Sequence, residues 1–325
     1  MIEWLKEGIP FMVWLQSLGD PLTLPMKFFS FLGTEYFYML LLPLLLWCID
    51  IGLGLRIGIL MLTSNGINAL FKLSFGLPRP YWVSNEVQAF STETSYGLPS
   101  GHAQNAVVLW GALAAAIKRW WATIACILII LLTSLSRPYL GVHFPQSVMI
   151  GWIIGIIVLV IYLGTNQRVT QWLRDRSLRD LLLLTIGYSL LFLLLGILVL
   201  ALTSDRVIPT EWIETAKAAA PEADPIDPRN LEGVINLSGM ILGFGSGAAL
   251  LTNWGGFKVD GPILQRFGRY IVGILGLFII FFGLRLILPE GDSILAQSLR
   301  YLHYALVSFW ASYLAPRLFV ALRLA

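Results

Sequence analysis

The chain has 325 residues, of which 57% are hydrophobic and only 13% are charged. Soluble domains carry about 25% charged residues, so this composition excludes an ordinary soluble globular protein. The formal net charge of +3 by itself points to no particular partner, and no nucleic-acid ligand is expected. Several apolar runs approach or exceed the ~20 residues that a helix needs to cross a bilayer. The sequence therefore predicts an all-α, polytopic membrane helical bundle.

The N-terminal segment, residues 1–26, begins with a mixture of large apolar and charged side chains. Trp4 and Trp14 occur in this segment together with the charged residues Glu3 and Lys6. This mixture is typical of a helix that lies in the membrane interface. No basic start precedes the apolar run and no small-residue cleavage site follows it, so we favour an interfacial helix over a signal peptide.

Hydropathy predicts about nine membrane-spanning helices. They are placed at 27–49, 52–73, 101–117, 120–136, 147–164, 181–203, 233–252, 269–288 and 294–315. Spans 1–5 make up a predicted core over residues 27–165, and spans 6–9 make up a C-terminal membrane region over residues 166–325. The long connection 204–232 contains a predicted short helix at 210–220. We interpret this connection chiefly as a solvated connector, with a lid over the site as the alternative.

The distribution of Lys and Arg predicts the orientation of these spans. Twelve of the 22 Lys and Arg residues fall on the face opposite to the N-terminus, and the basic face is expected to be cytoplasmic. The N-terminus and the connections 74–100 and 204–232 then face outward. Outward means the periplasm or exterior of a bacterium, or the endoplasmic reticulum lumen of a eukaryote.

Three short polar clusters interrupt the apolar sequence, each at the end of a predicted span and all on one predicted face. They are Lys72 to Arg79-Pro80, Pro99-Ser100-Gly101-His102, and Ser136-Arg137 followed by His143. Charged groups near a bilayer are costly and usually mark function. We therefore expect these clusters to form one functional site.

The residue types in these clusters suit a phosphate ester. Arg79 and Arg137 can offer forked contacts to phosphate oxygens, and Lys72 offers a point charge. Ser100 can cap the helix that follows it or donate to an anion, and Gly101 lets the backbone approach closely. No compact group of metal-ligand residues is present in the sequence, so neither a metal nor another cofactor is expected.

The clusters resemble the three signature blocks of the type-2 phosphatidic acid phosphatase superfamily, the membrane lipid phosphate phosphatases: K-x6-R-P, P-S-G-H and S-R-x5-H-x3-D. Every position matches except the last, where Ser147 replaces the aspartate. The resemblance implies that His143 is the nucleophile and forms a phosphohistidine. It also implies that His102 protonates the leaving oxygen and then activates water.

The aspartate of the family pattern orients the nucleophilic histidine, as the acid of a Ser-His-Asp triad does. Ser147 lies one helical turn after His143 and can orient the ring without carrying charge. The replacement predicts a slower or differently tuned enzyme, or a carboxylate borrowed from Glu86 or Glu93.

Several neighbouring details are similar to the glucose-6-phosphatase branch of this superfamily. They are Arg79-Pro80-Tyr81-Trp82, Phe90 to Thr94 with the pair Glu93-Thr94, Tyr139-Leu140 and His143-Phe144-Pro145. That branch also has nine spans, an outward N-terminus and no aspartate at the position of Ser147.

The leading prediction is an integral membrane phosphatase that hydrolyses a phosphomonoester or pyrophosphate of a lipid, such as phosphatidic acid or a polyprenyl phosphate. A sugar-phosphate phosphatase is the alternative within the family. An open lateral groove between spans would favour the lipid, whereas a closed polar pocket would favour the sugar. Other readings are a catalytically inactive relative, an anion transporter and a vanadium-dependent haloperoxidase.

Three features outside the clusters remain open or structural. The last four spans could line a lipid cavity, form a homodimer or carry an unrelated transport role. His303 lies outside all three clusters and is expected to be a structural histidine. Cys48 and Cys126 lie in apolar runs and are expected to pack rather than to pair.

Overall fold

The structure is a computed structural model that describes residues 1–289, 291 and 293–325. Helices make up most of these residues and no strand occurs among them, so the all-α prediction is confirmed. The described residues form two compact units, each built from segments that are far apart in the sequence. The motif unit comprises Met1–Phe37, Ile67–Leu163 and Gly196–Asn230, and the extension unit comprises Tyr38–Gly66, Gly164–Leu195 and Leu231–Ala325.

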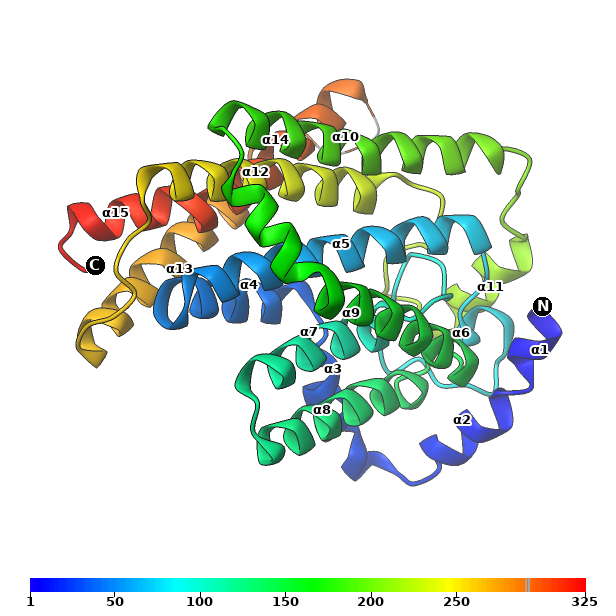
Figure 1. Cartoon of the computed structure of the whole chain (residues 1–325). Coiled ribbons are helices and arrows are strands. Elements are labelled where there is room, and N and C mark those ends of the chain that lie inside the picture. Colours follow the sequence, from blue (N-terminus) through cyan, green and yellow to red (C-terminus); the bar gives the residue numbers. More distant parts are fainter. Residues whose placement is uncertain (290, 292) are drawn as a thin grey trace. The chain divides into compact units, whose positions relative to one another are not determined.

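The motif unit is built mainly from short and medium helices. They are α1 (Ile2–Lys6), α2 (Ile9–Gln16), η1 (Asp20–Leu22), α3 (Thr23–Phe31), α6 (Pro80–Val83), α7 (Gly101–Ile117), α8 (Trp120–Tyr139) and α11 (Thr210–Ala219). Helices α7 and α8 lie side by side and are joined by a tight turn in which Lys118 has φ 54° (Figure 1). Helix α3 packs on α8, where the Thr133 hydroxyl donates to the Phe29 carbonyl at 3.2 Å.

Four longer stretches run from one unit into the other. They are α4 (Glu35–Leu44) with the π-helical turn η2 (Leu45–Ile49), α5 (Ile51–Phe75), α9 (Pro145–Arg174) and α10 (Leu178–Leu202). Each of these helices contributes residues to the packing of both units.

The extension unit is organised around the packing of α12 (Glu232–Trp254) on α14 (Ile294–Phe309). It also contains α13 (Ile263–Arg285), the π-helical turn η3 (Trp310–Leu314) and α15 (Ala315–Ala321). A Cβ atom on Gly243 of α12 would overlap the Ala305 carbonyl of α14, so these backbones approach closely. The core of the unit contains Trp47, which is fully buried and donates from Nε1 to the Ala311 carbonyl at 2.8 Å.

The N-terminal segment forms two short helices, α1 and α2, rather than one. The break falls at Gly8, where a Cβ atom would clash with Pro145. Leu5 is fully buried, whereas Trp4 and Trp14 are exposed. The segment thus keeps one apolar face inside the motif unit and presents tryptophans outward.

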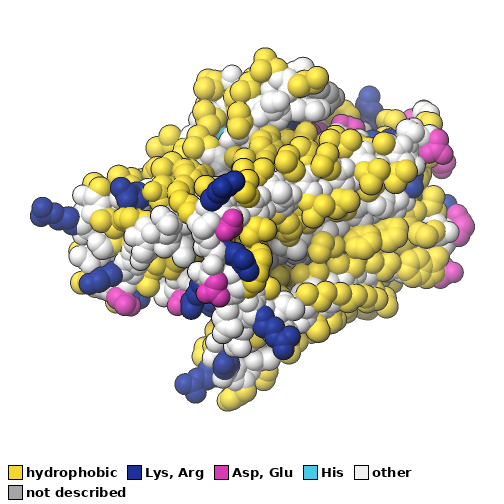
Figure 2. Space-filling model, turned by 45° about the horizontal axis from the view of Figure 1, so that its top comes forward, with side chains coloured by type: hydrophobic (Ala, Val, Ile, Leu, Met, Phe, Trp, Pro, Cys, Tyr) yellow, Lys and Arg dark blue, Asp and Glu magenta, His cyan; other side chains and the backbone are white. Residues whose placement is uncertain are grey.

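The apolar surface agrees with a multi-pass membrane protein. Figure 2 shows one face, where hydrophobic side chains cover wide areas and charged side chains are few and scattered between them. Among the described residues, six helical stretches are long and apolar enough to cross a membrane: Ile51–Val83, Trp120–Tyr139, Pro145–Arg174, Leu178–Leu202, Glu232–Trp254 and Ile263–Arg285. A seventh span results if Asp20–Phe31 and Glu35–Ile49, which are bent by 51°, count as one.

The predicted number of nine spans is therefore not confirmed. Helix α7 has 17 residues, which corresponds to about 25 Å and falls short of a bilayer core of about 30 Å. The predicted ninth span is α14, which ends at Phe309 and continues through η3. The predicted first span is the bent pair of helices.

The connection after α10 contains the predicted short helix, α11. Most residues of this connection are exposed or half-buried, as expected of a solvated connector, but Trp212 of α11 is only 9% exposed and packs against Trp82 with ring centroids 6.2 Å apart. Upstream, the Arg206 guanidinium donates to the carbonyls of Leu73 and Ser74 at 3.1 Å each and so caps α5. The connection is thus anchored at two points inside the motif unit.

Candidate active site

The structure brings all the predicted site residues into the motif unit. Lys72 lies in the last turn of α5, Arg79 precedes α6, Ser100 is the N-cap of α7, and Arg137 lies in the last turn of α8. Gly101 and His102 begin α7, while His143 and Ser147 flank and begin α9. The ends of α5, α6, α7, α8 and α9 therefore carry the predicted site residues.

A glycine turn carries the chain from Arg137 to His143. Gly141 has φ +78°, which strongly favours glycine, and its N–H donates to the Pro138 carbonyl at 3.1 Å. A Cβ atom there would also overlap the Gln88 carbonyl. This tight turn ends α8 and returns the backbone toward the start of α9, just before which His143 lies.

The protonation of the His143 ring follows from its contacts. Nδ1 lies 2.7 Å from the Gly97 carbonyl oxygen, which can only accept, so Nδ1 carries the proton. Nε2 lies 3.3 Å from Nη1 of Arg79, a group that can only donate. The lone pair of Nε2 therefore faces the guanidinium. Burial, together with the charges of Arg79 and Arg137, holds the pKa of His143 well below its usual range.

Arg79 is fully buried and its guanidinium is surrounded by acceptors from the motif unit. Nε donates to the Ser95 carbonyl at 2.6 Å, Nη1 to the Val142 carbonyl at 2.9 Å, and Nη2 to the Ser95 hydroxyl at 3.0 Å and the Tyr96 carbonyl at 3.2 Å. These contacts tie the connection 84–100 to the turn that carries His143. Arg79 thus helps to position the His143 ring as well as supplying charge.

Arg137 is 1% exposed and makes fewer contacts than Arg79 does. Its Nη1 donates to the Ser30 hydroxyl, and its Nη2 lies 2.7 Å from Oε1 of Glu93. Its Nε has no hydrogen-bond partner among the described residues. Since a guanidinium has five N–H donors, Arg137 retains directed donors for an anion.

Glu93 places a carboxylate between the two arginines. Oε2 lies 3.6 Å from Nη2 of Arg79, and the side chain is 30% exposed. Burial alone raises the pKa of Glu93, but the guanidinium groups of Arg79 and Arg137 outweigh it and hold that pKa well below its usual range. Glu93 is therefore an anion at neutral pH.

Lys72 reaches the same group of residues through a serine. Its Nζ donates to the Ser95 hydroxyl oxygen at 3.0 Å, and Arg79 donates to the same oxygen. Both lone pairs of this oxygen then face cations, which leaves the hydroxyl proton to point elsewhere. Ser95 thus links two of the three cationic residues.

His102 lies in the first turn of α7 beside Gly33, where a Cβ atom would overlap the imidazole ring. Its Nε2 is buried and has no hydrogen-bond partner among the described residues. An unpaired buried ring nitrogen is costly, so this geometry suits a group that exchanges a proton with a ligand.

The Pro-Ser-Gly-His cluster has a capping role in the structure. The Ser100 hydroxyl accepts from the Ala103 N–H at 3.4 Å, as an N-cap residue does. A Cβ atom on Gly101 would lie 3.0 Å from Oδ1 of Asn68, so a larger residue at this position would crowd that side chain. Asn68 in turn donates to Oε1 of Gln104 at 2.9 Å and joins α5 to α7.

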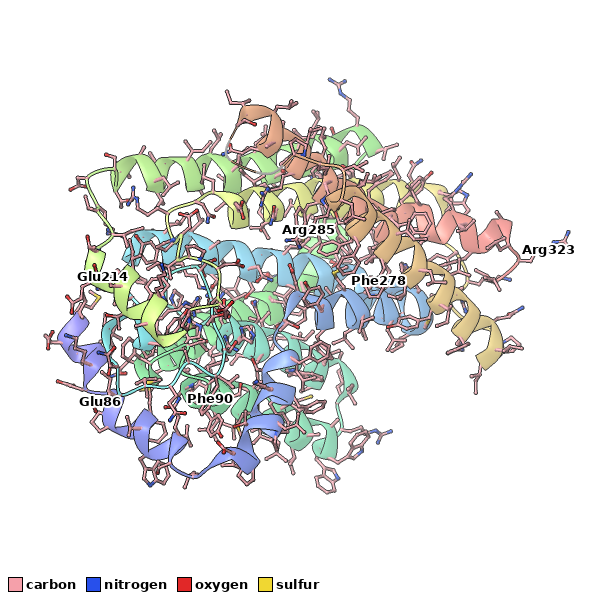
Figure 3. The ribbon with its side chains drawn as sticks, turned by 180° about the vertical axis from the view of Figure 1, so that it is seen from behind. Glu86, Phe90, Glu214, Phe278, Arg285 and Arg323 are labelled. Atoms are coloured by element: carbon pink, nitrogen blue, oxygen red, sulfur yellow. The ribbon has the colours of Figure 1, made fainter. Side chains whose placement is uncertain are left out.

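The orienting contact predicted for Ser147 is absent. Its hydroxyl oxygen is buried without a hydrogen-bond partner among the described residues, while its carbonyl accepts from the Ser100 N–H at 3.0 Å. The Gly97 carbonyl occupies the position beside Nδ1 of His143 instead. Of the two carboxylates proposed as substitutes, Glu86 is exposed and lies at the outer edge of the view in Figure 3. Glu93 lies in the site, where its carboxylate forms ion pairs with Arg79 and Arg137.

Sequence reasoning missed several residues that complete the site. Ser30, Asn68, Ser95 and Gln104 contribute side chains, and Gly97 contributes its backbone carbonyl. No signature block contains them, and they meet the site only through tertiary packing. Within the described part of the chain, no group of three or more metal-ligand side chains could hold an ion.

An apolar groove of about 300 Å³ lies between α2, α8 and α9. Its lining residues are Phe11, Leu131, Ser134, Leu135, Pro138, Pro145, Val148, Met149 and Trp152. Pro138 directly follows Arg137, and Pro145 lies two positions after His143. The groove thus reaches the helix ends that carry the site residues.

Comparisons with known proteins identify the family of the chain. The family model described as the PAP2 superfamily matches residues 53–171, and the model described as PAP2 superfamily phosphatase, transmembrane extension, matches residues 235–325. The chain is 29% identical to glucose-6-phosphatase 3 of Bos taurus over 75% of this chain and 73% of that protein.

Two further relatives have names that refer to lipids. The chain is 26% identical to lipid phosphate phosphatase delta of Arabidopsis thaliana, over 48% of this chain and 41% of that protein. It is 31% identical to an undecaprenyl-diphosphatase of Sulfolobus acidocaldarius, over 46% of this chain and 75% of that protein. Together with the site and the matching family models, these similarities establish that the chain belongs to the PAP2 superfamily.

Proposed function

We propose that this protein is a membrane phosphatase that hydrolyses a lipid phosphate on the extracytoplasmic face, with His143 as nucleophile and His102 as acid and base. Lys72, Arg79 and Arg137 bind the phosphate, together with the start of α7 at Ser100 and Gly101. The single observation that carries this proposal is the His143 ring, whose Nε2 lone pair faces a buried guanidinium 3.3 Å away.

The first step transfers the phosphoryl group to the enzyme. A phosphate oxygen replaces Nε2 of His143 as acceptor of the Arg79 N–H, which frees the lone pair. Nε2 then attacks phosphorus, the bond from phosphorus to the leaving oxygen breaks, and that oxygen takes a proton from His102. The fixed cations stabilise the charge on the phosphoryl oxygens.

The second step returns the enzyme to its starting state. His102 removes a proton from water, and the water oxygen attacks phosphorus. The bond between phosphorus and Nε2 of His143 breaks and orthophosphate leaves. The Gly97 carbonyl accepts a hydrogen bond from Nδ1–H of His143 throughout both steps. This hydrogen bond stabilises the positive charge that develops on the ring.

The open groove between α8 and α9 supports a lipid substrate rather than a sugar. A lateral groove was the feature expected of a lipid phosphatase, and its lining is almost entirely apolar. A hydrocarbon tail in this groove would leave its phosphate beside Arg137 and His143. The outward orientation of the site is carried over from the distribution of Lys and Arg across the nine predicted spans.

A sugar phosphate is the second candidate substrate. It is favoured by the similarity to glucose-6-phosphatase 3, which extends over 75% of this chain. The same phosphate-binding residues would serve either substrate, since the difference lies in the leaving group.

Phosphate release by the purified full-length protein tests the proposal. The panel contains phosphatidic acid, undecaprenyl diphosphate and glucose 6-phosphate, each with wild-type protein and with His143→Ala. We expect release from the lipid phosphate, its loss in the variant, and an acid-labile phosphoprotein in wild-type samples quenched during turnover. Absence of release from every compound by folded protein would refute it, and preferred release from glucose 6-phosphate would support the second candidate.

A further inference from the structure

The site contains a fixed negative charge that no phosphate-binding role explains. Glu93 places its carboxylate 2.7 Å from Arg137 and 3.6 Å from Arg79, among the groups that attract phosphate. A carboxylate at this position weakens the binding of any anion by Coulomb repulsion, and the weakening grows with the charge of the anion. Its presence therefore affects which anions the site accepts.

The backbone of Glu93 is held in place, so its charge is a permanent part of the site. The Tyr81 hydroxyl donates to the Glu93 carbonyl at 2.9 Å, and the Glu93 N–H donates to the same hydroxyl at 3.0 Å. Tyr81 is 2% exposed. The Tyr81 hydroxyl thus holds both the N–H and the carbonyl of Glu93.

The positions of the donors allow phosphate and Glu93 to be bound together. Glu93 lies nearer to Arg137, whereas Nε2 of His143 lies beside Arg79. Phosphorus has to approach His143, at the Arg79 side of the site. Arg137 still has its buried Nε without a partner among the described residues, so it can contact a phosphate oxygen while it keeps its contact with Glu93.

When Lys72 is protonated, the charges of the site sum to +2: three cations, Lys72, Arg79 and Arg137, and one anion, Glu93. A phosphomonoester carries a charge of about −2 once its second proton is lost. A diphosphate ester adds a further ionised phosphate oxygen and exceeds the fixed positive charge. Unmatched charge in a buried site is costly, so the diphosphate ester should bind less favourably than the phosphomonoester. A proton on His102 adds the same charge to the site for both substrates and does not change this difference.

We propose that Glu93 is a specificity-determining residue that matches the site to phosphomonoester dianions and disfavours diphosphate esters. This inference rests on the proposed phosphatase function and narrows its substrate class. It applies to a lipid or a sugar monoester alike, because it concerns only the charge of the phosphate group.

The test uses two substrates that share one tail and differ in charge: farnesyl phosphate and farnesyl diphosphate in detergent micelles. The ratio of kcat/KM for the monophosphate to that for the diphosphate is measured for wild-type protein, Glu93→Gln and Glu86→Gln. We expect a ratio above one for wild type, a shift of about tenfold toward the diphosphate in Glu93→Gln, and no change beyond twofold in Glu86→Gln. Glu86 is the matched control because it is an exposed carboxylate in the same connection.

Each other outcome has a definite meaning. Equal changes in both rates of Glu93→Gln would mean that Glu93 is displaced by phosphate or acts only structurally, and would overturn the inference. If Glu93→Gln does not fold, a wild-type ratio below one still overturns it, and a ratio above one supports it. If wild-type protein hydrolyses neither compound nor glucose 6-phosphate, the proposed function fails, which is distinct from hydrolysis with an unchanged ratio.

Discussion

Buried arginines in the two units of the molecule differ in what surrounds them. Arg137 of the motif unit is 1% exposed and contacts Ser30 and Glu93, which are 107 and 44 positions away. Arg269 of the extension unit is also fully buried, but its guanidinium donates to the carbonyls of residues 258, 259 and 260. Arg137 pairs with a carboxylate from a distant segment, whereas Arg269 holds a loop that is close in sequence.

This difference suggests a criterion by which an arginine proposed to bind substrate can be distinguished from a structural one in an apolar protein. Backbone carbonyls close in sequence accept from both Nη1 and Nη2 of Arg269, and only its Nε is without a hydrogen-bond partner among the described residues. In the motif unit, the arginines meet a carboxylate and a histidine ring whose second nitrogen is fixed by a carbonyl. Burial alone therefore does not identify a site, whereas long-range ionic contacts beside an exchangeable histidine do.

The histidines of the two units allow the strongest test of this comparison. His143→Ala should lower phosphate release by about a thousandfold or more, because no other group can form the covalent intermediate. His303→Ala, in the extension unit, should leave kcat/KM within about twofold, since His303 is a packed histidine beside Phe281. Phosphate release and thermal unfolding are measured for both variants. A comparable loss in His303→Ala with intact folding would break the comparison.

The arginines provide the next test. Arg137→Lys removes the forked donors and should lower kcat/KM by about a hundredfold with a small effect on the melting temperature. Arg269→Lys should do the reverse, lowering the melting temperature while leaving kcat/KM of the folded protein nearly unchanged. Steady-state kinetics and calorimetry on the same preparations check both. Similar kinetic losses in the two variants would show that the units are not functionally distinct.

Two glycines test the backbone around the site. A Cβ atom on Gly151 of α9 would lie 2.7 Å from the Ser100 carbonyl, so Gly151→Ala should shift the start of α7 and lower kcat/KM by about tenfold. Gly243→Ala would push α12 from α14 and should lower the free energy of unfolding by about 1–3 kcal/mol without changing kcat/KM of the folded protein. Chemical denaturation and kinetics distinguish the two effects. Unchanged kinetics in Gly151→Ala would indicate that α7 tolerates the shift.

The pH dependence of stability is the smallest expected effect. The folded pKa of His143 lies below the usual value of about 6.5, so below that pH the unfolded chain binds a proton that the folded chain does not. Stability should therefore fall as the pH drops from about 6.5, by up to about 1.4 kcal/mol per pH unit from this group. His143→Gln should remove that share. Denaturation at pH 7.5 and pH 5.5 compares the two proteins, and an identical pH slope would contradict a depressed pKa.

Much of the site could be predicted from the sequence because it is encoded in short segments. The spacings from Lys72 to Arg79 and from Arg137 to His143 are local, and apolar runs on either side place them at helix ends. The same local logic predicted α11, although not the burial of Trp212 that anchors it. The number of spans was less accessible, because the bend after Phe31 and the shortness of α7 depend on packing as well as on hydropathy.

The sequence by itself determined the helical class, the membrane character and the residue types of a phosphate site, since these depend on composition and local spacing. Only the tertiary structure decided which partners those residues meet. The Gly97 carbonyl, rather than Ser147, contacts Nδ1 of His143, and Glu93 lies on the arginines rather than beside the nucleophile. The physical reason is that the connection 84–100 folds back onto Arg79 and is held there by hydrogen bonds. These hydrogen bonds join residues that are distant in sequence, so no local sequence pattern predicts them.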